Sequence, residues 1–205
     1  QRDACMEVRG LSCERGFNSL FSDLEFPLST GELTRISGPN GSGKTTLLRT
    51  LAGIHQQRKG DIYWNGLSVA GSDSSFSSEI SFVGHKSGLR PDLPPLENLE
   101  FFAGLGTNKL SLTASQSLEI TGCTKFQNQP CHQLSAGQLQ RVTLARLCLA
   151  RTRLWLLDEP ATSLDRDGIK LLGNLIRQHA TAGGLVVYCS HQDLNSGPVV
   201  THTIR

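Results

Sequence analysis

Apolar positions along the chain follow two different spacings. Short apolar runs bounded by polar or glycine-rich turns predict strands over residues 32–37, 61–65, 80–83, 154–157 and 185–189. Apolar residues three and four positions apart predict helices over residues 45–54, 96–103, 114–120, 138–150 and 168–182. Because strands and helices alternate, we expect an α/β fold with a mostly parallel sheet covered on both faces.

The pattern changes in the middle of the chain, from about Lys86 to Cys131. Three prolines stand near the start of this part, and two of the predicted helices follow them. We interpret about residues 86–135 as a helical subdomain inserted into the α/β core. The serine-rich tract Ser68–Ser78 before it predicts a surface loop.

Composition limits the class of protein. The chain has 205 residues, of which 38% are hydrophobic, enough for one domain over residues 1–205. Its formal net charge of +2 gives no reason to expect nucleic acid as a partner. No stretch holds the ~18 apolar residues of a membrane-spanning helix. Since Gln1–Gly10 also lacks the apolar centre of a signal peptide, we expect a soluble chain that is not secreted.

The six cysteines are scattered without a Cys-x-x-Cys pair, so we interpret them as reduced thiols. The alternative is a metal site that uses Cys131 and the adjacent His132. It is disfavoured because no second pair of ligands stands at a suitable spacing.

A phosphate-binding loop is the first motif that carries chemistry. Residues 38–45 match G-x-x-x-x-G-K-[ST], between a predicted strand and a predicted helix. The glycines let backbone N–H groups turn onto phosphate oxygens, where the helix dipole also favours an anion. Lys44 is expected to reach the β- and γ-phosphates, and the Thr45 hydroxyl to bind Mg²⁺. The alternative is a glycine-rich turn with a surface lysine. The expected nucleotide-binding residues are Gly38, Pro39, Asn40, Gly41, Ser42, Gly43, Lys44, Thr45 and Thr46.

The apolar strand over 154–157 leads into two acids, Asp158 and Glu159. This is the arrangement of a Walker B segment, in which a carboxylate at the end of a buried parallel strand lies beside the phosphate-binding loop. Asp158 is expected to hold the Mg²⁺ shell and Glu159 to polarise the attacking water. The alternative is a pair of solvated acids.

A third motif narrows the field. Leu134-Ser135-Ala136-Gly137-Gln138 stands directly before a predicted helix and resembles the signature of the ABC family, usually Leu-Ser-Gly-Gly-Gln. A second phosphate site of this kind has to serve a second nucleotide, because the phosphate-binding loop already holds its own. The resemblance implies that Ser135, Gly137 and Gln138 contact ATP bound to the facing copy of a head-to-tail dimer. The alternative is an ordinary helix cap.

The resemblance extends to two further places. Ser163-Leu164-Asp165 resembles the family's D-loop, and His191 resembles the switch histidine that senses the γ-phosphate. A lone histidine at a strand end is more often structural, and the order of the motifs favours the functional interpretation. The resemblance therefore implies an ABC-type ATPase that uses ATP and Mg²⁺, with Lys44, Glu159 and His191 as catalytic residues.

Two places depart from the family pattern. The glutamine usually found after the strand over 80–83 is replaced by His85-Lys86, which puts coupling to a membrane partner in question. The expected adenine-stacking position holds Arg15, with Phe17 nearby. Recognition of ATP over GTP therefore rests on the resemblance.

One branch of the family fits best, the ATP-binding subunits of the cytochrome c maturation transporter, also called the haem exporter. The residues that resemble it include Gly84-His85, Trp64, Leu96-Glu97-Asn98-Leu99 and Gly183-Gly184. This resemblance implies an integral membrane partner, two ATPase copies peripheral on the cytoplasmic face of the inner membrane, and a role in haem delivery for c-type cytochromes.

Several alternatives remain open for the machine that the chain drives. The chain could instead act on the matrix side of the mitochondrial inner membrane, or as a soluble ABC ATPase that drives an assembly or scaffold function. A pseudo-ATPase is disfavoured because Lys44, Asp158, Glu159 and His191 are all present.

Overall fold

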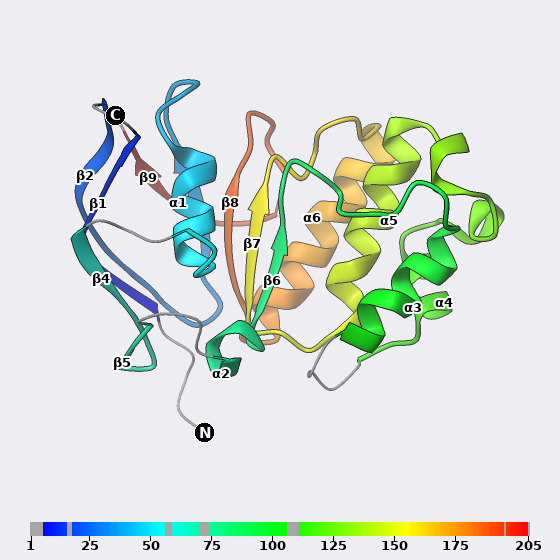
Figure 1. Ribbon diagram of the computed structural model, residues 1–205, viewed down its shortest axis with the longest axis horizontal. Coiled ribbons are helices and arrows are strands. Elements are labelled where there is room, and N and C mark those ends of the chain that lie inside the picture. The colour runs from blue at the N-terminus through cyan, green and yellow to red at the C-terminus, as the bar shows by residue number, and fades with distance from the viewer. Residues whose placement is uncertain are drawn as a thin grey trace.

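A five-stranded parallel sheet forms the centre of the protein (Figure 1). The computed structural model describes residues 6–15, 18–55, 59–69, 74–105, 111–194 and 196–204. In spatial order the strands are β6 (Ile80–Val83), β7 (Leu154–Asp158), β8 (Leu185–Cys189), β3 (Leu33–Ser37) and β9 (Val200–Thr203). The mostly parallel α/β core expected from the sequence is confirmed.

The two faces of this sheet pack against different partners because alternate side chains of a strand point to opposite faces. Leu156 and Val187 face α1 (Lys44–Leu51). This helix packs between the parallel sheet and a second sheet of four strands. Leu157 and Val186 face α5 (Ala136–Leu149) and α6 (Arg166–Thr181). Both faces are therefore covered, which explains why β7 and β8 are buried along their whole length.

The second sheet is antiparallel and was not expected from the sequence. It consists of β2 (Asn18–Leu28), β1 (Met6–Arg15), β4 (Lys59–Trp64) and β5 (Leu67–Ser68), in that order. The buried residues of β1 are Met6, Val8, Leu11 and Cys13, so the alternation breaks between Val8 and Leu11. A shift in strand register falls at the same place, and it hides the strand from a search for period two.

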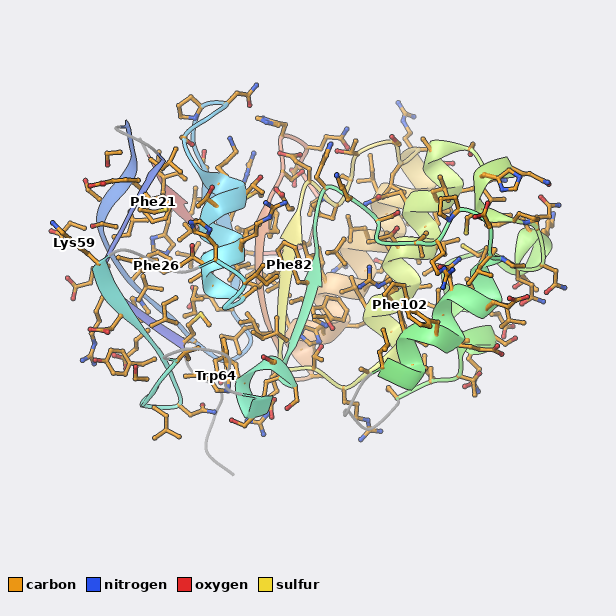
Figure 2. All side chains as sticks on the ribbon, in the orientation of Figure 1. Phe21, Phe26, Lys59, Trp64, Phe82 and Phe102 are labelled. Carbon is orange, nitrogen blue, oxygen red and sulfur yellow. The ribbon has the colours of Figure 1, made fainter. Side chains whose placement is uncertain are left out.

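The prediction of a surface loop over Ser68–Ser78 is wrong in part. Ser74–Ser77 forms the short helix α2, and its Phe76 is buried against Trp64 with 5.7 Å between the ring centroids. In Figure 2 Trp64 lies beside this short helix. One aromatic residue in a polar tract thus anchors the tract to the core.

The helical part of the chain has a hydrophobic cluster of its own. It contains α3 (Pro95–Leu105), α4 (Ala114–Ile120), the 3₁₀ turns Thr124–Phe126 and Cys131–Gln133, and one side of α5. Asn98 is fully buried here and binds the backbone of Arg90, Leu93 and Pro94, which fixes the proline-containing loop before α3. The helices predicted over 96–103 and 114–120 are confirmed.

No disulfide joins the described cysteines, Cys13, Cys123, Cys131, Cys148 and Cys189. Cys131 is buried beside Asn98, and the His132 ring contacts the Pro91 carbonyl. Within the described ranges, no three histidine, cysteine or acidic residues gather as a metal site would require. None of the described helices is long and apolar enough to cross a membrane.

One half-buried histidine of α6, His179, packs against β7. The ring of His179 stacks on Trp155 with 3.9 Å between centroids and an interplanar angle of 7°. Its Nε2 lies 3.3 Å from the Arg153 carbonyl oxygen. Burial favours the neutral ring and lowers the pKa of His179 from 6.5 to about 4.

Acidification should therefore destabilise the fold through His179. The contribution of the neutral ring is complete above pH 6.5 and is lost as the pH falls from 6.5 to about 4. We expect the free energy of unfolding, measured in urea, to fall less over this window in His179→Phe than in the unmodified chain. The difference between the two falls should reach up to about 3 kcal/mol. His132→Phe changes an exposed histidine and should keep the original pH dependence. Identical pH profiles for His179→Phe and the unmodified chain would contradict the assignment.

Candidate nucleotide-binding site

Four neighbouring strands end at one edge of the parallel sheet. The segments that follow β6, β7, β8 and β3 carry His85, Glu159, His191 and the loop 38–43, respectively. Open α/β sheets bind their ligands at the carboxyl edge. A pocket of about 510 Å³ lies here, lined by Leu20, Asn40, Gly41, Gly43, Lys44, Thr45, Thr46, His85, Asp158, Glu159, Thr162 and His191. The topology thus brings most of the sequence-predicted residues together.

The loop before α1 depends on glycine at two points. Gly38 has φ +155°, and a Cβ atom there would lie 2.5 Å from the Ile204 carbonyl oxygen. Gly43 caps α1 with φ +94°, and a Cβ atom there would lie 3.0 Å from the Cβ of Leu20. The backbone N–H groups of the first turn of α1 are open to an anion in this conformation, and the helix dipole adds to their attraction.

Lys44 lies across the same loop. Its ammonium group donates hydrogen bonds to the carbonyl oxygens of Gly38 and Pro39, at 2.8 and 2.9 Å. The positive charge is therefore held at the mouth of the anion site. A long, flexible side chain in this place can exchange these carbonyls for phosphate oxygens.

Asp158 adds a buried carboxyl group to the lining of the same pocket. Only 4% of the residue is exposed, and its Oδ2 atom has no hydrogen-bond partner among the described residues. A buried carboxylate of this kind requires a cation. The Thr45 hydroxyl lines the same pocket, and oxygen ligands of these two types suit Mg²⁺.

Glu159 and His191 contact each other across two strand ends. Glu159 Oε1 lies 3.5 Å from His191 Nε2, and Glu159 Oε2 accepts a hydrogen bond from the His191 backbone N–H at 3.4 Å. Glu159 has the left-handed φ of +51°, and its N–H donates to the Cys189 carbonyl. The turn aims the carboxylate into the pocket beside Thr162, where it can act on a water molecule.

The signature residues lie elsewhere. Ser135 caps α5 and forms a capping box with Gln138, in which each side chain binds the backbone N–H of the other. Ser135, Gly137 and Gln138 do not line the pocket described above. Figure 1 shows α1 and α5 on opposite faces of the parallel sheet. The structure thus places the predicted signature residues apart from the pocket that holds the loop before α1.

Two pocket residues escaped the sequence analysis. Leu20 comes from β2, a strand that the sequence patterns did not predict, and Thr162 follows Glu159 by three residues. The spacing from the acidic pair could have indicated Thr162. Of the expected adenine contacts, Arg15 is the last residue of β1, and Phe17 lies outside the described residues. Adenine recognition stays a prediction.

Comparison with known proteins decides the family, because the model for ABC transporters matches residues 21–162. The chain belongs to the ABC transporter family. It is similar to the cytochrome c biogenesis ATP-binding export protein CcmA of Pasteurella multocida, with 43% identity over 93% of this chain and 90% of the relative. The CcmA protein of Aliivibrio fischeri is 41% identical over 92% of this chain and 93% of its own length.

Solved structures of ABC cassettes share the fold. A post-hydrolysis dimer of the ATP-binding cassette MJ0796 bound to ADP and Pi has a TM-score of 0.82 at 24% identity, over 98% of this chain and 96% of that one. The ADP conformation of the cassette MJ1267 has a TM-score of 0.78 at 18% identity, over 99% and 88%. This chain is an ABC-type ATPase. The roles of its individual site residues stay predictions.

The geometry predicts that Glu159→Gln separates ATP binding from hydrolysis. The substitution removes the base and leaves Lys44, Thr45 and the glycines unchanged, so we expect an undiminished affinity for MgATP and a kcat lowered at least about 100-fold. Binding of a fluorescent ATP analogue and release of phosphate measure the two properties. Lys44→Ala is the matched comparison and should weaken binding itself. Turnover at the original rate by Glu159→Gln would reject this carboxylate as the base.

Proposed function

We propose that two copies of this chain assemble head to tail around two MgATP molecules and drive a membrane-embedded partner in c-type cytochrome biogenesis. The observation that supports the dimer is the separation, within one chain, of the loop before α1 from the N-terminus of α5. The pocket at the carboxyl edge holds the loop of α1 but none of Ser135, Gly137 and Gln138. A second copy can supply them.

Each side chain then has a distinct task. Lys44 would neutralise the β- and γ-phosphates, and Thr45 and Asp158 would hold Mg²⁺, which would supply positive charge to the phosphoryl group during transfer. Glu159 orients the attacking water and accepts its proton, and His191 stands 3.5 Å from that carboxylate, beside the position of the γ-phosphate. The N-terminus of α5 binds the nucleotide of the facing copy.

The biological role is supported by the relatives. The chain matches proteins named cytochrome c biogenesis ATP-binding export protein over about nine tenths of their length. On that basis we place it as the energy-coupling subunit that serves haem delivery, peripheral on the cytoplasmic face of the membrane. The net charge of +2 still offers no reason to add nucleic acid as a partner.

The contact with the membrane partner is best assigned to the segment after β6 and to α3. Arg146 of α5 donates to the Ser87 carbonyl at 2.7 Å and stacks over the Phe102 ring of α3 at 3.9 Å. The segment that begins with His85 is thereby fastened to both helices. Phe101 and Leu105, four residues apart on α3, are 45% and 65% exposed and form an apolar surface for a partner.

A mixed-dimer experiment tests the head-to-tail arrangement. Copies with Lys44→Ala lack a working phosphate-binding loop, and copies with Ser135→Arg lack a working signature. Neither should hydrolyse ATP alone, and their mixture should regain one composite site in each mixed dimer. Gel filtration and phosphate release measure assembly and activity. If the mixture recovers neither ATP-dependent dimers nor turnover, the arrangement is wrong.

Substitution of both His85 and Lys86 by alanine tests the coupling segment. His85 lines the nucleotide pocket, and the segment leads directly to α3. A ligand shifts an equilibrium only through differential affinity, so closure around ATP has to change the surface that the partner contacts. We expect a clear loss of partner-stimulated activity and of c-type cytochrome assembly, and a smaller effect on basal ATPase activity, because His85 itself lines the nucleotide pocket. Unchanged assembly at matched expression would exclude the coupling role.

A further inference from the structure

The segment between β7 and α6, residues 159–165, has a backbone that other contacts have to hold in place. Glu159 and Ser163 both have a left-handed φ, +51° and +66°, although neither is glycine. Non-glycine residues persist in this region only when their surroundings fix them. The conformation that directs Glu159 into the nucleotide pocket is therefore maintained from outside the segment.

The contacts that hold it come from the first turns of α5. Gln140 Nε2 donates a hydrogen bond of 2.8 Å to the Pro160 carbonyl oxygen, one residue after Glu159. Arg141 donates to Asp165 Oδ1 at 2.7 Å, and the same oxygen caps α6 through the Gly168 N–H. The two bonds hold the segment near both of its ends, at Pro160 and at Asp165.

Between these ends, the backbone of the segment packs closely against the start of α5. A Cβ atom on Gly137 would lie 2.7 Å from the Ser163 carbonyl oxygen, so only glycine permits the observed approach of α5 to the segment. Within the segment, the Thr162 N–H donates to the Glu159 carbonyl and the Leu164 N–H to the Ala161 carbonyl. These bonds close the turn, and the Pro160 carbonyl is the group to which Gln140 donates.

Gln140 differs from Arg141 in the group it binds. Arg141 pairs with a side chain that is largely exposed, at 68%, and water competes with such a pair. Gln140 is partly buried and binds a backbone carbonyl, so its bond acts on the path of the main chain itself. The direction of the Glu159 side chain follows from that path.

We propose that Gln140 is a positioning residue for Glu159. Its amide holds the Pro160 carbonyl and so keeps the neighbouring carboxylate at the orientation that hydrolysis requires. Gln140 does not line the nucleotide pocket, and its proposed action is through the backbone alone. The inference rests on the proposed function, in which Glu159 activates water.

The first test is Gln140→Met, which keeps the length of the side chain and removes the donor. We expect kcat to fall about tenfold, because small displacements of a catalytic group are costly. The KM for ATP should stay within about twofold, since the residues around the phosphates are unchanged. Gln129→Met removes an exposed glutamine and serves as the control with original values. A urea midpoint equal to that of the unmodified chain shows that the fold is intact.

The protonation state of Gln140→Glu supplies a second readout. A neutral carboxylic acid can donate to the Pro160 carbonyl, whereas a carboxylate cannot. The kcat of Gln140→Glu, relative to that of the unmodified chain at the same pH, should therefore rise as the pH is lowered toward the pKa of the introduced acid. Gln140→Met should show a ratio that does not vary with pH. A merely structural role would produce no such difference between the two variants.

Mixed dimers show through which site Gln140 acts. In a dimer of Lys44→Ala and Ser135→Arg copies, the working site takes its loop and Glu159 from the Ser135→Arg copy. Gln140→Met should lower kcat about tenfold when placed in that copy and leave it unchanged in the Lys44→Ala copy. The reverse result would mean that Gln140 acts through the N-terminus of α5, and would overturn the proposal.

The remaining outcomes are also decisive. Unchanged kcat in Gln140→Met, or a parallel loss of kcat, ATP affinity and stability, would reject a positioning role while leaving the proposed function intact. Turnover by Glu159→Gln at the original rate, or failure of the parent mixed dimer, would instead reject the proposed function itself. The two failures are thus distinguished by variants measured in the same assay.

Discussion

The site depends on the parallel pairing of β6, β7, β8 and β3. Parallel strands place all their carboxyl ends at one edge, so residues more than 100 positions apart in sequence are brought into one pocket. Asp158 of β7 pairs with Cys189 of β8. This register brings Glu159 and His191, which follow the two strands, to the same level along the sheet edge. Because both faces of the sheet are covered, this register is fixed by the packing of two hydrophobic clusters.

Groups of opposite charge lie close together at that edge of the sheet. The buried Asp158 carboxylate, with one oxygen unpartnered among the described residues, lines the same pocket as Lys44 and the start of α1. Its charge also adds to burial in raising the pKa of the Cys189 thiol, which keeps that thiol protonated. The fold thus supports an arrangement that a cation and a phosphate group would stabilise.

The proposal of a composite site rests on the placement of two helices on opposite faces of the parallel sheet. The helix that follows the phosphate-binding loop lies on one face, and the helix that begins at Ser135 lies on the other. One chain cannot direct both helix N-termini at one nucleotide. At the same time, α5 contacts the turn after Glu159 through Gln140. In the proposed dimer, each chain would therefore link its own catalytic carboxylate to the helix that it presents to the second copy.

The sequence by itself determined the parallel core, the phosphate-binding loop and the acidic pair, because each depends on local spacing and on the strand or helix beside it. It missed β1 and β2, whose irregular register breaks the apolar alternation, and it missed the anchoring of Phe76. Only the tertiary structure decided which residues meet: Leu20 at the loop, and Gln140 at Pro160. A contact between distant segments depends on strand order and on helix packing. The spacing of apolar residues within one segment specifies neither of them.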